Sequence, residues 1–203
     1  MGENMEKQMI ISISREYGSG GHGVANKLGE LLGLPVYDKN IMFEIAQEKG
    51  VDMSEWDDHE EKPGNRLLYR RVGNYSSNPS DIIHEMEFDF IKEKAASGKS
   101  FIVLGRCSDY ILRDYEGLIK IFIRGDMEDK ILRLMKRLDE SREEAIADIN
   151  KIDRLRRKYH NKHADTKWGD SRHYDLCINT HIGVEETAHI IESFVRKYME
   201  LDA

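Results

Sequence analysis

A cluster of glycines near the start of the chain has the residue types and spacing needed to bind phosphate. The segment reads SREYGSGGHG and directly follows the apolar run MIISIS. Glycines let successive backbone N–H groups turn toward one point, and the N-terminus of a following helix adds positive potential there. We therefore predict a phosphate-binding loop made of six consecutive residues: Gly18, Ser19, Gly20, Gly21, His22 and Gly23.

This loop departs from the P-loop pattern G-x-x-x-x-G-K-[ST], in which the lysine reaches the phosphates and the hydroxyl holds Mg²⁺. In the aligned positions Arg15 replaces the first glycine, Gly21 the lysine and His22 the hydroxyl residue. The cradle of backbone amides survives these changes, but the cation and the metal ligand do not. We predict that Arg15 supplies a substitute charge, because a guanidinium grips phosphate oxygens with two hydrogen bonds. His22 either contacts phosphate or is an exposed loop histidine.

Two more charged residues follow predicted strands. Arg106 comes after the continuous apolar run SFIVLG, and a charge in that place is costly without an anionic partner. We expect Arg106 to bind the phosphate of an acceptor. Asp38 ends the run LPVYD. It either binds a ribose hydroxyl, a base or a metal, or caps a following helix.

A basic stretch near residue 155 carries charges at helical spacing. Asp153, Arg156 and Arg157 stand at i, i+3 and i+4, which places them on one face of a helix, with Arg154 on the neighbouring face. One interpretation is a solvated surface with ion pairs. The other is a lid that closes its arginines over migrating phosphate charge.

The elements that must position these residues alternate regularly between strand and helix. Apolar runs predict five strands: 9–14, 34–38, 100–105, 118–123 and 174–179. Helical spacing predicts helices over 24–32, 40–50, 81–96 (capped by Ser80), 127–138, a long one beginning at Ser141, and 184–198. Ser141 and Glu144 form a capping box. We predict an α/β fold with three layers, a five-stranded parallel sheet covered by helices on both faces.

Composition narrows the class of protein further. A length of 203 residues fits one domain. The net charge of −7 argues against a broad nucleic-acid-binding face, and no apolar run reaches the length of a membrane span. Two widely separated cysteines, without a C-x-x-C motif or a signal-peptide pattern, indicate a reducing cytoplasm and no cysteine-held metal.

Three segments of the sequence resemble the cytidylate kinase-like family, which has a P-loop nucleoside-monophosphate kinase fold. They are ISISREYGSGGHGVANKLGELLGLPVYDK, IVLGRCSDYIL and DRLRRKYHNKHADTKWGDSRHYDLCINT. The resemblance spans nearly the whole chain. The resemblance implies transfer of a phosphoryl group from ATP, with Mg²⁺, to a nucleoside monophosphate. CMP or dCMP would be the first acceptors to test.

The resemblance also implies roles for segments and residues. Within one domain of residues 1–203, it assigns 39–98 as the acceptor segment and 150–173 as the lid. The family's lid arginines map onto Arg154 and Arg156, with Arg157 as an extra, and Arg15 joins them as a catalytic cation. Asp38, Arg106 and Asp153 become acceptor-binding residues. The alternative is a nucleotide-binding regulatory protein without turnover, because the P-loop lysine and hydroxyl are missing. The oligomeric state stays open.

Overall fold

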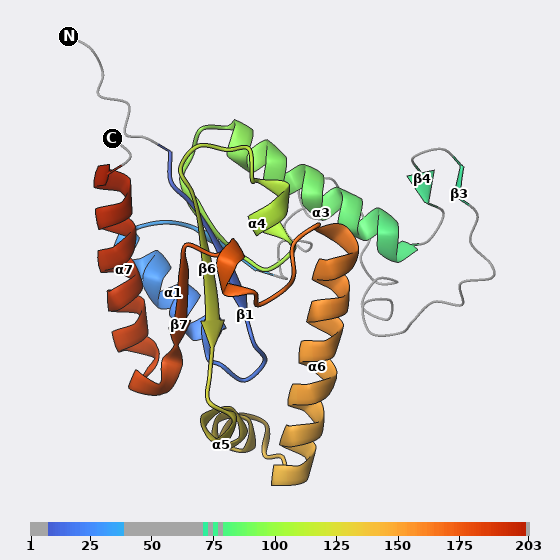
Figure 1. Ribbon diagram of the computed structural model, residues 1–203, viewed down its shortest axis with the longest axis vertical. Coiled ribbons are helices and arrows are strands. Elements are labelled where there is room, and N and C mark those ends of the chain that lie inside the picture. Colours follow the sequence, from blue (N-terminus) through green and yellow to red (C-terminus); the bar gives the residue numbers. More distant parts are fainter. Residues whose placement is uncertain (1–7, 39–70, 73–74, 77–78, 202–203) are drawn as a thin grey trace.

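The computed structural model describes residues 8–38, 71–72, 75–76 and 79–201, which fold around a five-stranded parallel sheet (Figure 1). The strand order is β2-β5-β1-β6-β7, and every neighbouring pair runs parallel. This confirms the predicted α/β fold. The strands are β1 (Ile10–Arg15), β2 (Val36–Tyr37), β5 (Phe101–Leu104), β6 (Leu118–Arg124) and β7 (Leu176–Asn179).

The helices of the described residues lie close to their predicted positions. They are α1 (Gly21–Leu32), α3 (Pro79–Ala96), α4 (Ser108–Ile111), α5 (Met127–Leu138), α6 (Arg142–His163) and α7 (Val184–Leu201). Short 3₁₀ turns, η1 (Ser171–His173) and η2 (Thr180–Ile182), flank β7. Sequence patterns did not predict α4, the 3₁₀ turns or the small antiparallel hairpin of β3 (Arg71–Val72) and β4 (Tyr75–Ser76). The predicted helix 40–50 and much of the predicted acceptor segment lie outside the described residues.

Two of the three capping residues predicted at helix ends are confirmed by the structure. Ser141 caps α6, and its side chain and that of Glu144 form the predicted capping box. Gly33 ends α1 with a φ of 66°, a conformation that favours glycine. The prediction for Ser80 was wrong, because α3 begins at Pro79 and Ser80 therefore lies inside its first turn.

Two apolar layers hold helices on opposite faces of the sheet. On one face, alternate residues of β1 such as Ile11 and Ile13 pack against α1 and α7, and these residues are fully buried. On the other face, Ile10 packs with Phe90 of α3 and with β5. Figure 1 shows α1 and α7 together on one side, with α3 and α4 on the other. A third, smaller cluster joins α5 to α6.

The strand order also marks where a ligand is expected. The chain leaves β1 toward α1 on one face, and it leaves the neighbouring strand β5 toward α4 on the opposite face. In open parallel sheets, ligands bind beyond the carboxyl ends of strands where the connections diverge in this way. Arg15 ends β1, and Arg106 follows β5 by two residues. The crevice is therefore expected between these two arginines.

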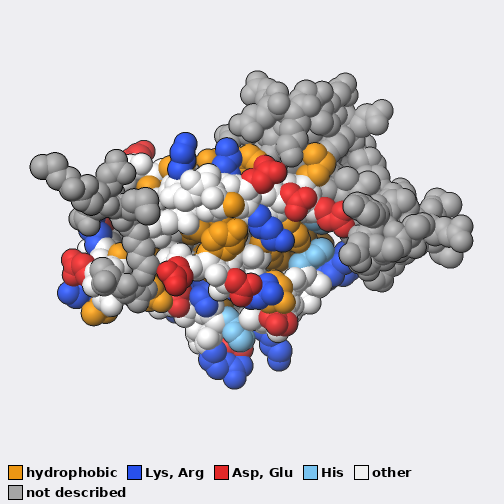
Figure 2. All heavy atoms as spheres, turned by 90° about the horizontal axis from the view of Figure 1, so that it is seen from above, with side chains coloured by type: hydrophobic (Ala, Val, Ile, Leu, Met, Phe, Trp, Pro, Cys, Tyr) orange, Lys and Arg blue, Asp and Glu red, His pale blue; other side chains and the backbone are white. Residues whose placement is uncertain are grey.

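The surface adds two observations. No helix within the described ranges is long and apolar enough to cross a membrane. On the face drawn in Figure 2, basic and acidic side chains of the described residues are interspersed. The described residues on that face form no continuous basic surface of the kind that duplex nucleic acid binds.

Candidate functional site

The glycine loop between β1 and α1 has the backbone geometry of an anion site. Gly18 and Gly20 have φ angles of 74° and 79°, and Gly20 is the N-cap of α1. Within the described part of the chain, no protein acceptor binds the N–H groups of Gly18, Gly20, His22 and Gly23. The first turn of α1 also contains no acidic residue. These open donors at a helix start make the loop suited to phosphate.

A buried ionic network holds the base of this loop. Lys130 of α5 is 4% exposed, and its Nζ lies 3.1 Å from Glu16 Oε2 and 3.3 Å from Asp153 Oδ2. Asp153 Oδ1 accepts a 2.6 Å hydrogen bond from the N–H of Tyr17, and Glu16 Oε2 accepts one from Gly125 N–H. Both oxygens of Asp153 are thus engaged by the protein. The acceptor-binding role of Asp153 stays a prediction, and the structure gives this residue a loop-positioning role instead.

Two further side chains fix the outer side of the loop. Arg133 of α5 donates a hydrogen bond from Nη1 to the carbonyl of Gly18. Thr180 Oγ1 donates to the carbonyl of Ser19 at 2.6 Å. Sequence reasoning missed Lys130 and Arg133. Their spacing of three residues on one predicted helix was the available signal, because it places both on the same face.

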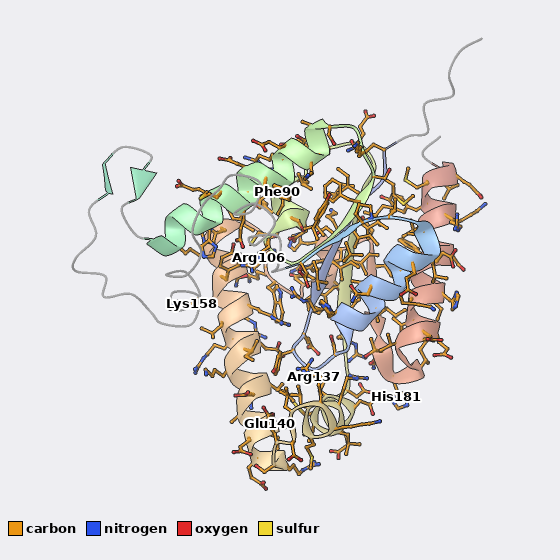
Figure 3. The ribbon with its side chains drawn as sticks, turned by 180° about the vertical axis from the view of Figure 1, so that it is seen from behind. Phe90, Arg106, Arg137, Glu140, Lys158 and His181 are labelled. Carbon is orange, nitrogen blue, oxygen red and sulfur yellow. The ribbon has the colours of Figure 1, made fainter. Side chains whose placement is uncertain are left out.

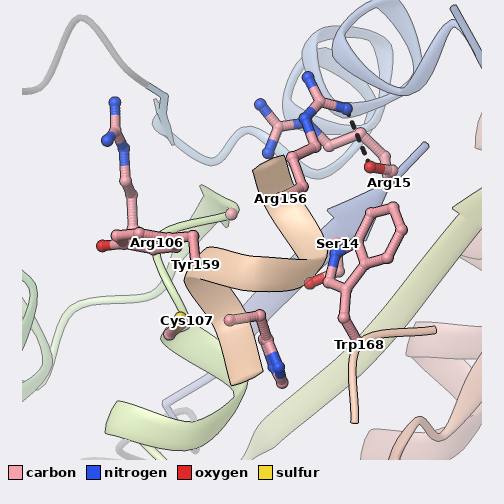
Figure 4. Close-up of a pocket in the computed structure, with 9 residues that line it drawn as sticks. Ser14, Arg15, Arg106, Cys107, Arg156, Tyr159 and Trp168 are labelled. Atoms are coloured by element: carbon pink, nitrogen blue, oxygen red, sulfur yellow. Dashed lines mark hydrogen bonds between the residues drawn. The ribbon is translucent and has the colours of Figure 1, made fainter. Parts of the chain in front are cut away.

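The structure brings three arginines to one small pocket at the carboxyl ends of β1 and β5 (Figure 4). Arg15, Arg106 and Arg156 line a cavity of about 50 Å³. Its other lining residues are Ser14, Gly105, Cys107, Tyr159, His160 and Trp168. Figure 4 shows the Arg15 and Arg156 side chains next to each other, and Arg156 Nη1 donates to the Arg15 carbonyl at 2.9 Å. Such crowding of cations favours an anionic ligand.

The pKa of Arg15 reflects this crowding. Burial, followed by the charges of Arg156 and Arg106, lowers it from 12.5 to about 9, while Asp38 acts in the opposite direction. Burial also lowers the pKa of Arg156. A pKa of about 9 leaves Arg15 charged at neutral pH, where an anion beside it would relieve the repulsion from Arg156 and Arg106. The predicted role of Arg15 as a phosphate-binding cation therefore has a physical basis.

Arg106 has a structural partner that sequence reasoning missed. Its Nη1 lies 3.0 Å from Glu87 Oε1, and the Glu87 side chain is only 1% exposed on α3. His84 Nδ1 lies 3.2 Å from the other oxygen of Glu87. Figure 3 shows Arg106 in the middle of the molecule, near α3. The expectation that an anionic ligand is the partner of Arg106 was therefore incomplete.

The backbone around Arg106 is unusual. Gly105, Arg106 and Cys107 have successive φ angles of 83°, 59° and 52°. Residues other than glycine rarely adopt this left-handed conformation, and such residues cluster at functional sites. Burial, followed by the charge of Asp109, raises the pKa of the Cys107 thiol well above its usual range, so Cys107 is a packing residue rather than a nucleophile.

The lid-like segment reaches the pocket through the second half of α6. Arg156 faces the pocket, whereas Arg154 and Arg157 are exposed and do not line it. The guanidinium of Arg157 lies 5.7 Å from the ring of Trp168, which packs against Phe122 of the sheet. The catalytic roles of Arg154 and Arg157 stay predictions.

A buried pair fixes this half of α6 to α4. His160 Nε2 lies 2.9 Å from Asp109 Oδ2, and each side chain is only 4% exposed. The pair lies at the pocket, because His160 is one of its lining residues. It therefore positions the lid-like helix beside the turn that carries Arg106.

Asp38 and His22 lie together at the start of α1. His22 Nδ1 is 3.4 Å from Asp38 Oδ2, with His22 about half exposed and Asp38 largely buried. Neither residue lines the pocket of the three arginines. The two interpretations of Asp38, ligand binding or helix capping, both remain, because the residues that follow it lie outside the described ranges.

Comparison with known proteins agrees with this geometry. Residues 10–182 match the model of the cytidylate kinase-like family. The chain belongs to the cytidylate kinase-like family. Membership of this kinase-like family supports a phosphotransferase activity, and it confirms the resemblance seen in the sequence.

Individual relatives are distant. A cytidylate kinase of Pyrobaculum aerophilum is 23% identical over 184 residues, which cover 90% of each chain. One from Saccharolobus islandicus is 27% identical and covers 85% of this chain and 82% of its own.

Solved structures show the same architecture. An uncharacterized protein from Eubacterium ventriosum has a TM-score of 0.73 and 33% identity, covering 93% of this chain and 99% of its own. A shikimate kinase from Acinetobacter baumannii, at 16% identity with a TM-score of 0.54 and 96% coverage of both chains, shares the fold.

The open amides of the glycine loop give a direct prediction. Titrating isotope-labelled protein with inorganic tripolyphosphate is expected to shift the amide resonances of Gly18, Gly20 and Gly23. Gly33 and Gly98 serve as controls, because they also have positive φ angles but lie away from the loop with open space around them. Equal shifts at the control glycines, or none at the loop, would contradict an anion site there.

Proposed function

We propose that this protein transfers the γ-phosphoryl group of ATP to a nucleoside monophosphate, with CMP and dCMP as the first acceptors to test. One observation carries the proposal. A glycine loop with open amides and a pocket of three arginines lie at the carboxyl ends of the adjacent strands β1 and β5. Phosphoryl transfer requires two anionic substrates side by side, with cations over the migrating charge. The family of the chain supports the same reaction class.

The roles follow from position. The open amides of Gly18, Gly20, His22 and Gly23 would hold the donor phosphates. Arg106 would hold the acceptor phosphate. Arg15 and Arg156, whose side chains lie together between these two sites, would stabilise the charge of the group in transfer. The segment around Trp168 covers β6 beside the pocket and would exclude water. We expect the reaction to take place in the cytoplasm.

Beside the glycine loop, the described residues include one carboxylate that fits Mg²⁺. His22 stands where a P-loop has its hydroxyl ligand, and imidazole is a poor ligand for this hard cation. The carboxylate of Asp38, 3.4 Å from His22, has the oxygen donors that Mg²⁺ prefers. Asp38 is therefore the residue we assign to the metal that accompanies ATP. The metal would neutralise phosphate charge as the bond to the leaving group breaks.

A second candidate function is nucleotide binding without turnover. Gly21 and His22 favour it, because they remove the lysine and the hydroxyl of the P-loop pattern from the first turn of α1. Such a protein would bind ATP or a monophosphate and act as a sensor.

A coupled assay of ADP release distinguishes the two functions. The assay covers a panel of nucleoside monophosphates, with and without Mg²⁺, and a parallel sample omits the acceptor. We expect ADP release that depends on acceptor and Mg²⁺ for CMP or dCMP. An Arg156→Ala variant purified in the same way controls for contaminating kinases, and its turnover is expected to fall about 10²-fold. ATP binding without transfer to any monophosphate would overturn the kinase proposal in favour of the sensor.

A further inference from the structure

We propose that Arg15 and Gly21 are an exchanged pair: compared with the P-loop pattern, the cation stands at position 15 instead of position 21, and the glycine at position 21 instead of position 15. The phosphate-binding cation that a P-loop carries on the first turn of its helix would be delivered here from the end of strand β1, through space that Gly21 leaves open. The ligand class is the terminal phosphates of a nucleoside triphosphate. The inference rests on the proposed function, because it concerns the donor nucleotide of the same site.

The space around Gly21 carries the first step. A Cβ at position 21 would lie 2.7 Å from Arg15 Cβ and 2.9 Å from Arg15 Cγ, closer than real Cβ atoms approach other carbons. Gly21 does not have a positive φ, so its backbone conformation does not require glycine. Space alone therefore excludes a side chain. A lysine at position 21 would begin where the stem of Arg15 already runs, and the two cannot coexist.

The far end of Arg15 shows the same fit. A Cβ at Gly105, the residue after β5, would collide with Arg15 Nη1. Arg15 thus crosses from β1 past the start of α1 to the end of the neighbouring strand, with a glycine at each end of its path. This route ends in the pocket shared with Arg106 and Arg156. Gly105 has a positive φ of 83°, which by itself favours glycine, so the spatial argument for the pairing rests on Gly21.

The charge of Arg15 indicates what it meets there. Arg156 and Arg106 both disfavour its positive charge, and of the described residues Asp38 is the one that counteracts them. Phosphate bound at the neighbouring loop amides would supply the missing negative charge. Arg15 would thus supply the positive charge that the P-loop pattern places on a lysine at position 21.

Relocating the charge tests this pairing. Four variants are compared with the wild type: Arg15→Ala, Gly21→Lys, and the doubles Arg15→Gly/Gly21→Lys and Arg15→Gly/Gly21→Ala. The doubles carry glycine at position 15, because an alanine Cβ there would still lie 2.7 Å from a Cβ at position 21. Calorimetric titration with Mg-ATP, without any acceptor, measures affinity, and thermal unfolding checks folding. The second double is the matched control, because it fills position 21 and removes Arg15 but restores no charge.

We expect Arg15→Ala to weaken ATP binding by roughly 10–150-fold, the usual effect of losing a charge-assisted contact. Gly21→Lys alone is expected to weaken binding and lower the melting temperature, because the two stems collide. The lysine double should bind ATP at least about 10-fold more tightly than the alanine double. Equal affinity of the two doubles, or an unchanged affinity of Arg15→Ala, would overturn the inference.

The ATP-binding test of the exchanged pair and the kinase assay of the proposed function can fail independently of each other. If the affinities follow the expected pattern while the wild type phosphorylates no monophosphate, the kinase proposal fails and the exchanged pair stands. If CMP is phosphorylated while both doubles bind ATP equally, the reverse holds. A wild type that does not bind ATP overturns both.

Discussion

Replacing Lys130 with methionine is expected to destabilise the protein by about 3–5 kcal/mol, the usual cost of removing one partner from a buried ion pair. Lys130 is nearly inaccessible, and its ammonium lies between Glu16 and Asp153, so methionine would leave two carboxylates facing each other. Asp153 is also mostly buried and holds the N–H of Tyr17. The loss should therefore loosen the glycine loop as well as the packing of α5 on α6.

Equilibrium unfolding in urea measures this effect. Lys136→Met is the matched control, because Lys136 lies on the same helix but is exposed. The control is expected to change the free energy of unfolding by less than about 0.5 kcal/mol. A loss below about 1 kcal/mol for Lys130→Met would show that the network contributes little. Asp153→Asn should give a smaller loss than Lys130→Met, because asparagine keeps an acceptor for Tyr17 N–H.

Arg106→Ala is expected to impair both folding and acceptor binding. The arginine is the cation beside the buried carboxylate of Glu87, so its removal should cost about 3 kcal/mol, at the low end for buried pairs because His84 remains. Loss of a charge-assisted contact should also weaken monophosphate binding by roughly 10–150-fold. The sequence alone predicted the weaker monophosphate binding but not the loss of stability.

A double variant separates the two effects. Arg106→Ala/Glu87→Gln removes the buried carboxylate charge together with its partner, so most of the lost stability should return while CMP affinity stays low. Thermal unfolding and calorimetric titration with CMP provide the two measurements. Unchanged CMP affinity in either variant would restrict Arg106 to a structural role. An unchanged melting temperature for Arg106→Ala would contradict the importance of Glu87.

Much of the fold follows from local patterns in the sequence. Helix α5 has the predicted bounds Met127–Leu138, because a strong apolar period begins just after a strand and stops at a turn. The buried strands β5 and β6 were recognisable as continuous apolar runs. Pro79 shows the limit, since proline is favoured in the first turn of a helix and outweighed the capping signal of Ser80.

The site was only partly predictable, because its decisive pairs are distant in the sequence. Glu87 looks like one more surface carboxylate on α3 until Arg106, 19 residues later, is placed over it. Lys130 meets Glu16 across 114 residues. The left-handed backbone at Arg106 has no signal either, since neither Arg106 nor Cys107 is glycine. The parts of the site that could be predicted from local sequence were the loop glycines and the residues at the ends of the strands.

The contacts between α6 and the glycine loop imply that the two ends of the site are thermodynamically linked. Asp153 accepts the hydrogen bond of Tyr17 N–H, and Arg156 donates to the carbonyl of Arg15, so part of the loop's support comes from the lid-like helix. By reciprocity, any ligand that orders the loop must stabilise docking of this helix by the same free energy. The amide hydrogen of Tyr17 exchanges with solvent only when its bond to Asp153 opens. The exchange rate of this amide therefore reports how firmly α6 is docked on the loop, and bound nucleotide should slow it.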